Sequence, residues 1–371
     1  MYIPQPGPTR APEVVANLGK LGNEVIALSP PERQFVEMGV RIRPIRLTNL
    51  PFVGSVFLIG FALILAILAF VRQRPEVLYT LGGSMGTGLL VAKLFRCPLI
   101  SEVNGWRRAE LRLIKKKSLA MFISRISCWL DEQEIKRSNH VIAVAGGIKE
   151  AIVKDLRVPP SKISVIPNGA NAQMFRPMTG AKESLQLDLS CLYVGFVGIM
   201  APWQGLQDLI RSAPLILREV PNTKFLMVGD GVRTSEVMRW VKQSNLTNEF
   251  VFVGEVAYAE VPRYISAMDL CISFRKGTPA SPLKIYEYAL CGKPVVATDC
   301  SDNSFVKEYG AGILVDPEKE WEVAKSIVSL LKDRELRERM GNNGRKYVLE
   351  TRSWEAVARE IEGVIKATIA N

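Results

Sequence analysis

Residues 281–297 read SPLKIYEYALCGKPVVA, and this stretch decides the fold class. Its first part is predicted to be a helix that carries Lys284 and Glu287 three residues apart on one face. Gly292 and Pro294 then end the helix and introduce a short apolar strand. A helix that leads directly into a buried strand is the repeating element of an α/β protein with a parallel sheet.

The same alternation of strand and helix continues along the rest of the chain. Short apolar strands recur at spacings of roughly 20–35 residues, with helix-length segments between them, which predicts parallel sheets built from right-handed βαβ units. The predicted strands are Glu24–Leu28, Glu76–Tyr79, Pro98–Glu102, His140–Val144, Ile163–Ile166, Leu192–Gly198, Lys224–Val228, Val251–Val253, Leu270–Ser273, Lys293–Ala297 and Gly312–Val315.

The segment Phe175–Lys182 (FRPMTGAK) is the predicted join between two domains, because it combines proline, glycine and polar residues. We expect residues 1–177 to form one Rossmann-like domain and residues 178–352 a second. Residues 353–371 are expected to form a helix that crosses back onto the first domain. In such a pair of domains the ligand lies in the crevice at the carboxyl ends of the strands.

Composition excludes several classes of protein. With 48% hydrophobic and 23% charged residues over 371 positions, the chain is neither disordered nor collagen-like. Its six cysteines are far apart and form no CxxC pair, so we expect reduced thiols in a cytoplasmic protein. The single histidine, His140, and the lack of a DxD triplet argue against a zinc site and a divalent-metal clamp. We therefore expect no metal and no cofactor.

The net charge of +11 is confined to the first half of the chain, because residues 1–177 carry a net +12 and residues 178–371 a net −1. A one-sided basic charge predicts a polyanionic partner. No recognisable nucleic-acid-binding module accompanies it, so we expect an anionic membrane surface and no nucleic acid.

Two segments of the first half have the composition of membrane-contacting helices. Phe52–Val71 is uncharged and long enough to span a bilayer, but predicted strands on both sides favour a helix packed on the sheet with one face in the membrane. Trp106–Trp129 mixes cations with apolar and aromatic residues, as interfacial helices do; a solvated amphipathic helix is the alternative. Its expected membrane or acceptor contacts are Trp106, Arg107, Arg108, Arg112, Lys115, Lys116 and Lys117. We thus expect a peripheral protein at the inner membrane face.

The start of the helix in residues 281–297 suits a phosphate group. Ser281 and Lys284 would stand beside free backbone N–H groups at the positive end of the helix dipole. Glu287, one turn further, can accept hydrogen bonds from two vicinal ribose hydroxyls. Taken by itself, this spacing favours a surface ion pair between Lys284 and Glu287.

Together with four further segments, this stretch resembles the family 4 glycosyltransferases, which have the GT-B fold of two facing Rossmann-like domains. The segments occur in the family's order along almost the whole chain: Val165–Phe175 (VIPNGANAQMF), Val197–Gly205 (VGIMAPWQG), Phe225–Gly231 (FLMVGDG) and Val251–Val256 (VFVGEV). The resemblance implies a retaining, metal-independent glycosyltransferase. With the basic first half, it implies transfer of a hexose from a nucleotide-diphosphate sugar to a lipid-linked or membrane-associated glycan acceptor.

The resemblance also implies roles for individual residues. The implied catalytic residues are Asn104, where many members have a histidine, and Lys284, beside the donor diphosphate. Glu102 is placed on the acceptor side. The implied donor-binding residues are Gly7, Gly198, Gln204, Gly254, Val256, Ser281, Lys284 and Glu287.

Departures from the family pattern keep a second interpretation open. Ala280 stands where the first of two paired glutamates is expected, Gln204 replaces a lysine, and Asn104 replaces the histidine. The chain starts at MYIPQPG, so we expect the family's first strand to be residual or the start to be mis-set. The alternative is a non-catalytic GT-B protein that binds a sugar nucleotide or a partner glycosyltransferase at the membrane. An epimerase is disfavoured, because a single histidine leaves few acid–base groups.

Overall fold

The computed structural model describes residues 10–29, 42–44, 67–68, 70–82, 86–112, 119–277, 281 and 283–370. The chain divides into two compact units. Unit 1 comprises Met1–Asn168, Thr278–Ser281 and Trp354–Asn371, and unit 2 comprises Gly169–Gly277 and Pro282–Ser353. The division thus falls before the segment Phe175–Lys182, where the sequence placed the join.

Unit 1 contains a four-stranded parallel sheet in the order β3-β4-β5-β6. A separate parallel pair joins β1 to β2. Strand β4 is buried along its whole length, as expected for a central strand covered on both faces. The strands are β1 (Ala27–Ser29), β2 (Ile42–Pro44), β3 (Leu78–Leu81), β4 (Leu99–Val103), β5 (His140–Ala143) and β6 (Ile163–Val165).

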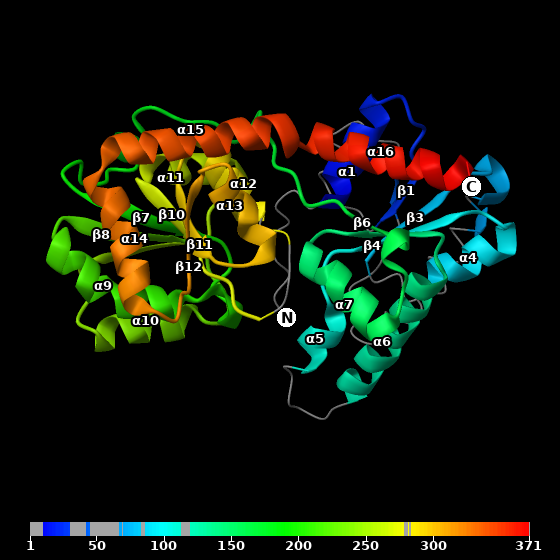
Figure 1. The fold of residues 1–371 in the computed structure, drawn as a ribbon, viewed down its shortest axis with the longest axis horizontal. Coiled ribbons are helices and arrows are strands. Elements are labelled where there is room, and N and C mark those ends of the chain that lie inside the picture. Colours follow the sequence, from blue (N-terminus) through cyan, green and yellow to red (C-terminus); the bar gives the residue numbers. More distant parts are fainter. Residues whose placement is uncertain are drawn as a thin grey trace. The chain divides into compact units, whose positions relative to one another are not determined.

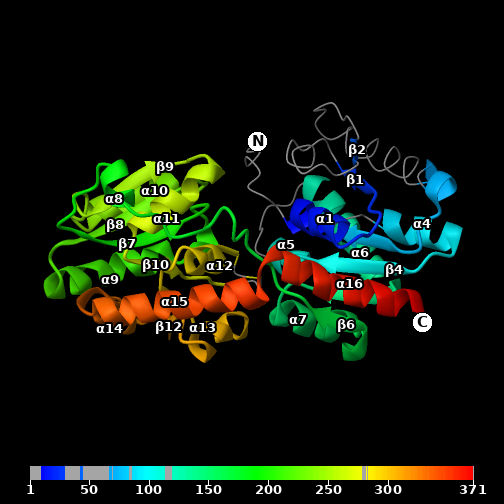
Figure 2. The same ribbon diagram turned by 90° about the horizontal axis from the view of Figure 1, so that it is seen from above.

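The helices of unit 1 come from both ends of the chain. Helix α16 packs against α1 (Figure 2). The side chain of Asn23 also contacts α16, because its Nδ2 donates a hydrogen bond to Glu362 Oε1 at 2.9 Å. Helix α7 covers β5 through a cluster that includes Ile148 and Val141. The described helices are α1 (Arg10–Lys20), α4 (Thr87–Phe95), α5 (Arg107–Arg112), α6 (Leu119–Arg137), α7 (Gly146–Leu156) and α16 (Trp354–Ala370), with the 3-10 turn η1 (Pro160–Lys162).

Unit 2 is built on a six-stranded parallel sheet in the order β12-β11-β10-β7-β8-β9, the doubly wound order of a Rossmann-like domain. Successive residues of β7 face opposite cores: Val194 and Phe196 enter one cluster, Tyr193 and Val197 the other. The strands are β7 (Leu192–Val197), β8 (Thr223–Val228), β9 (Phe250–Gly254), β10 (Leu270–Ser273), β11 (Val295–Thr298) and β12 (Gly312–Val315).

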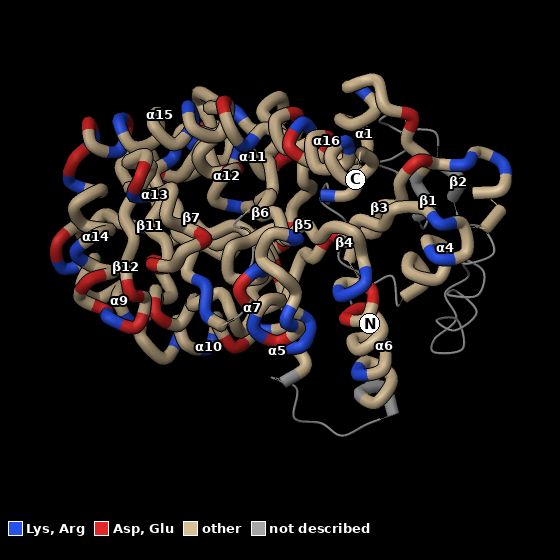
Figure 3. The backbone as a smooth tube through the Cα atoms, turned by 45° about the vertical axis from the view of Figure 1, so that its right-hand side comes forward, with Lys and Arg blue, Asp and Glu red and all other residues tan. Residues whose placement is uncertain are grey.

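Helices cover both faces of this sheet. Helices α9, α10 and α14 pack on one face, and α11, α12, α13 and α15 on the other (Figure 1). Acidic and basic residues are interspersed along α9, α14 and α15, in agreement with the near-zero charge of the second half (Figure 3). The bounds are α8 (Ala181–Ser184), η2 (Pro202–Gln204), α9 (Leu206–Glu219), α10 (Thr234–Gln243), η3 (Tyr258–Glu260), α11 (Val261–Ala267), α12 (Leu283–Leu290), η4 (Ser301–Asn303), α13 (Ser304–Glu308), α14 (Glu320–Lys332) and α15 (Arg334–Thr351).

The prediction of a single interfacial helix over Trp106–Trp129 is wrong. Helix α5 ends at Arg112 and α6 begins at Leu119, and residues 113–118, with Lys115, Lys116 and Lys117, lie outside the described residues. Trp106 is only 5% exposed, and its indole N–H donates to Asp155 Oδ2 at 3.0 Å. A tryptophan has one polar atom, so a single carboxylate allows the whole ring to be buried.

Most of the apolar segment Phe52–Val71 also lies outside the described residues. Within the part that is described, Phe70 is buried and stacks on Phe95 of α4, with ring centroids 4.9 Å apart. None of the helices in the described ranges combines the length and apolarity needed to cross a bilayer.

Candidate functional site

In unit 2, polar side chains and glycines gather where β7, β8 and β9 end. The loop after β7 begins at Gly198, whose φ is +134°, and a Cβ there would lie 3.1 Å from Lys284 Nζ. The N–H of Gly229, after β8, donates to the carbonyl of Gly254 at 2.7 Å, and a Cβ on Gly229 would lie 2.3 Å from the Gly198 carbonyl. Three strand ends are thereby held together by main-chain contacts at the carboxyl edge of the sheet, which is where ligands of parallel sheets bind.

Lys284, at the start of α12, lies beneath this loop. Its ammonium donates to Gln204 Oε1 at 2.9 Å and stands 4.2 Å from the ring centroid of Phe196. Burial, and then the nearby charge of Arg275, lower the pKa of Lys284 to about 7. A bound anion would raise the pKa of Lys284 again, so the amine is suited to become protonated when an anionic ligand binds.

Glu287 lies one turn further along α12 and is buried. Its Oε1 accepts a 2.6 Å hydrogen bond from the hydroxyl of Tyr258 in η3. Burial raises the pKa of Glu287 to about 7, and the hydrogen bond from Tyr258 and the charge of Lys284 oppose this rise. The two groups of α12 are therefore both close to half-ionised at neutral pH.

Sequence reasoning missed Tyr258. It placed the base-binding loop at Gly254 and Val256, and the only signal for Tyr258 was an aromatic residue with a polar tip two positions later. Val256 itself packs against the same apolar cluster of unit 2 as Tyr258.

Two further predicted donor-site positions, Gly7 and Ser281, and the departure at Ala280 have different outcomes. Gly7 and Ala280 lie outside the described residues. Ser281 belongs to unit 1, where its buried hydroxyl accepts a 2.8 Å hydrogen bond from the backbone N–H of Asn168. This hydroxyl therefore already has a main-chain partner.

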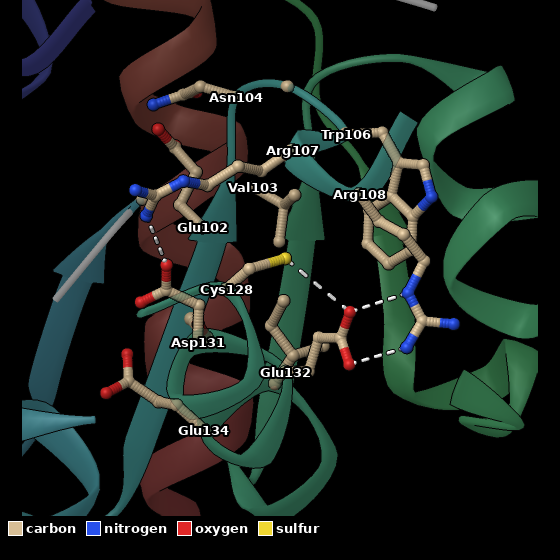
Figure 4. A pocket seen from close by; sticks show the side chains of 14 residues that line it. Glu102, Val103, Asn104, Trp106, Arg107, Arg108, Cys128, Asp131, Glu132 and Glu134 are labelled. Carbon is tan, nitrogen blue, oxygen red and sulfur yellow. Dashed lines mark hydrogen bonds and ion pairs between the residues drawn. The ribbon is translucent and has the colours of Figure 1, made fainter. Parts of the chain in front are cut away.

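Unit 1 has its own cavity, of about 430 Å³, at the carboxyl end of β4 (Figure 4). Its walls come from β4, the residues around the start of α5, and α6. Glu102, Asn104, Trp106, Arg107 and Arg108 line it, so the structure brings five of the predicted catalytic and acceptor-side residues to one place.

The sequence predicted that Arg107 and Arg108 contact a membrane or an acceptor. In the structure the two arginines do not project freely. Arg107 Nη1 lies 3.1 Å from Asp131 Oδ2, and Arg108 makes two 2.7 Å hydrogen bonds to Glu132 (Figure 4). The acidic residues of α6, distant in sequence from the basic cluster, neutralise both cations. The side chain of Arg112 lies outside the described set.

Glu102 has no exposed surface. Its Oε2 accepts hydrogen bonds from Arg10 Nε at 2.8 Å and from the Tyr79 hydroxyl at 2.6 Å. Asn104, two residues later, is exposed, and its amide nitrogen lies 3.8 Å from the position of a Cβ on Gly82. In the described ranges of the chain, no cluster of three or more histidine, cysteine, aspartate or glutamate residues could hold a metal ion.

Family models match both units. Residues 9–173 match the model of Glycosyltransferase Family 4, and residues 191–333 match that of Glycosyl transferases group 1. The chain belongs to the family 4 glycosyltransferases. Its activity class is therefore glycosyl transfer, as the motifs implied.

Relatives of this family 4 glycosyltransferase include archaeal and bacterial proteins. An uncharacterized glycosyltransferase of Methanocaldococcus jannaschii is 22% identical over 76% of this chain and 72% of its own length. The UDP-Gal:alpha-D-GlcNAc-diphosphoundecaprenol alpha-1,3-galactosyltransferase of Escherichia coli is 24% identical over 66% of this chain and 63% of its own length. The Anabaena protein Alr3699/HepE, solved with UDP-glucose, is 18% identical and superposes with a TM-score of 0.76 over 98% of this chain and 96% of its own. The predicted GT-B fold is confirmed.

Proposed function

We propose that this glycosyltransferase moves a hexose from a nucleotide-diphosphate sugar to a lipid-linked or membrane-associated glycan acceptor, with retention of anomeric configuration. The observation that carries the proposal is the arrangement of α12. Lys284 lies under the Gly198 loop and contacts Gln204, and Glu287 lies one turn further along the helix. A cation in the first turn of a helix suits a diphosphate, and a buried carboxylate suits vicinal ribose hydroxyls.

The chemistry then needs few protein groups. The bond between the anomeric carbon and the donor phosphate breaks, and the acceptor oxygen bonds to that carbon on the same face. The departing phosphate takes the acceptor's proton. Lys284 and backbone N–H groups stabilise the negative charge on the leaving diphosphate, without a metal ion. The asparagine at position 104, where many family members have a histidine, is compatible with this mechanism. Substrate positioning and stabilisation of the leaving group account for most of the rate acceleration.

A membrane acceptor is supported by two observations. The E. coli relative acts, by its name, on a sugar carried by diphosphoundecaprenol. In unit 1, α6 exposes Phe122, Ile126 and Trp129, which recur at helical spacing on one face, and Phe122 is 61% exposed. The basic run that ends at Lys117 immediately precedes this helix in the sequence. Apolar anchors next to cations suit an anionic bilayer, so we place the protein at the inner face of the cell membrane, in cell-envelope polysaccharide synthesis.

Calorimetric titration with UDP-glucose, UDP-galactose, UDP-N-acetylglucosamine and GDP-mannose tests the proposal. A donor-hydrolysis assay on those that bind then follows, with and without EDTA. Binding with EDTA-insensitive turnover supports a metal-independent transferase, and an NMR spectrum of the released or transferred sugar reports its anomeric configuration.

Binding without turnover would instead favour a non-catalytic GT-B protein. One observation favours that second candidate: Gln204 supplies an amide where the family pattern has a lysine, so the donor site carries one cation fewer. If none of the four donors binds, transfer from these donors is contradicted, and the second candidate is left only as a protein that binds a partner glycosyltransferase.

A further inference from the structure

Tyr258 connects two parts of the candidate donor site in unit 2. It lies in η3, on the segment that follows β9, and its hydroxyl donates a 2.6 Å hydrogen bond to Glu287 Oε1 on α12. The sequence placed the base-binding loop at Gly254 and Val256, just before Tyr258, and the ribose-binding carboxylate at Glu287. One side chain therefore links the loop expected to hold the base to the carboxylate expected to hold the ribose.

The ring of Tyr258 is held in place independently of Glu287. It packs edge-on against the ring of Phe175, with ring centroids 5.4 Å apart, and against the apolar cluster on this face of the sheet. Phe175 itself has no exposed surface. Because packing fixes the ring, the hydroxyl of Tyr258 has a defined position from which to donate.

The hydrogen bond from Tyr258 restricts how Glu287 can meet a ligand. Glu287 is only 6% exposed, so few groups can determine the orientation of its carboxylate. An ionised carboxylate accepts hydrogen bonds at about four lone-pair sites, and Tyr258 occupies one of them. The remaining sites are enough for two vicinal hydroxyls, provided that the carboxylate does not rotate away from them.

The same hydrogen bond acts on the charge of Glu287. Burial raises the pKa of Glu287 to about 7, and the hydrogen bond from Tyr258 is the largest effect that opposes this rise. An ionised carboxylate accepts through both oxygens, whereas a protonated one uses one oxygen to donate. Tyr258 therefore favours the form of Glu287 that suits a diol.

We propose that Tyr258 is the positioning residue for the donor ribose and gives the site its selectivity for a ribonucleotide over a 2′-deoxyribonucleotide. Its hydroxyl holds Glu287 so that the remaining acceptor sites of the carboxylate meet the 2′- and 3′-hydroxyls of the ribose. This inference rests on the proposed function, because it takes Glu287 as the group that binds the ribose.

The test is calorimetric titration of the full chain with UDP, GDP and their 2′-deoxy forms. At least one ribonucleotide should bind the wild type about tenfold more tightly than its 2′-deoxy form does. Tyr258→Phe keeps the ring and removes only the hydroxyl. It should raise the Kd of that ribonucleotide about tenfold and the Kd of the 2′-deoxy form less than about threefold, so that most of the selectivity is lost.

A double-mutant cycle separates this role from a general effect on the fold. In a Glu287→Ala background, Tyr258→Phe should change the Kd of the ribonucleotide less than about twofold, because the group that Tyr258 positions is absent. A tyrosine with a structural role alone would weaken binding by the same factor in both backgrounds.

Tyr193→Phe is the matched control. Tyr193 belongs to the same apolar cluster, and its hydroxyl donates to the Asp188 carbonyl at 3.2 Å. It lies near the amino end of β7, whereas the candidate donor site lies at the carboxyl end of this strand. The variant loses one hydroxyl of a packed tyrosine, as Tyr258→Phe does, and should keep the wild-type Kd for every nucleotide.

The proposal is overturned if Glu287→Ala weakens ribonucleotide binding and Tyr258→Phe does not, or if Tyr258→Phe weakens it equally in both backgrounds. The proposed function stands in both cases. If no ribonucleotide binds the wild type, or if Glu287→Ala binds it as the wild type does, the proposed function loses its ribose assignment and this proposal fails with it. If Tyr258→Phe does not fold, equal affinity of the wild type for a ribonucleotide and its 2′-deoxy form would still overturn the proposed selectivity.

Discussion

Donor affinity should fall steeply as the pH rises above neutrality, because of Lys284. Its pKa of about 7 means that the ammonium is about half-protonated at pH 7 and almost wholly neutral at pH 8.5. The donor diphosphate needs the charged form and raises the pKa of Lys284 when bound, so binding takes up about half a proton at pH 7 and about one proton at pH 8.5. For a free-state pKa of 7, the Kd should rise about 16-fold between pH 7.0 and 8.5.

Lys284→Arg is the perturbation that isolates this effect. A guanidinium keeps its charge throughout this range, so the Kd of the variant should change less than twofold between the same pH values. Nucleotide sugars are the right ligands, because their diphosphates do not titrate there. The assay is calorimetry in two buffers with different ionisation enthalpies, which also counts the protons bound.

The reasoning is refuted if the wild-type Kd is constant from pH 7.0 to 8.5 and the heat does not depend on the buffer. It is equally refuted if Lys284→Arg shows the same pH dependence as the wild type, since another group would then be titrating.

Three further expectations address the ribose contact, the membrane contact and the backbone of the donor site. Glu287→Ala should weaken donor binding by about 1–3 kcal/mol, measured calorimetrically on folded protein, because the ribose hydroxyls lose their acceptor; equal dissociation constants would disprove the assignment. Replacing Lys115, Lys116 and Lys117 by glutamine should weaken binding to anionic vesicles by roughly two orders of magnitude at low salt, because each cation contributes about 1 kcal/mol. Neutral vesicles should bind both the wild type and the variant weakly. Equal sedimentation of the two proteins with anionic vesicles would contradict the membrane contact. Gly229→Ala should destabilise unit 2 by about 3 kcal/mol in thermal unfolding, because its Cβ would lie 2.3 Å from the carbonyl oxygen of Gly198. Gly254→Ala is the milder control. The φ of Gly254 is +79° but its Cβ would meet no atom within 4 Å, so the variant should lose about 1 kcal/mol of stability.

The sheet of unit 2 could be predicted because each of its strands is a short apolar run between helix-length segments. A strand is present at each of the predicted positions from Leu192 to Val315. The roles implied for Lys284 and Gln204 came from motifs that are local in sequence, and the structure places these two side chains 2.9 Å apart.

The features that escaped prediction depend on partners distant in sequence. Tyr258 meets Glu287 across 29 residues, and Arg10 meets Glu102 across 92, so neither pair leaves a local pattern. The basic cluster at Arg107 and Arg108 was interpreted as membrane-facing because composition cannot distinguish cations that meet lipid from cations that meet the carboxylates of α6.

The position of α16 has a consequence for how the protein is made. This helix packs on α1, and its residues Val357, Ala358 and Ile361 are buried. Unit 2 is complete once Ser353 has been synthesised, whereas unit 1 waits for a helix that follows it. Because domains fold during translation as their residues emerge from the ribosome, the unit begun first is finished last. Until then the apolar side of α1 is open to chaperones, and a chain interrupted before Trp354 has one complete unit and one incomplete unit.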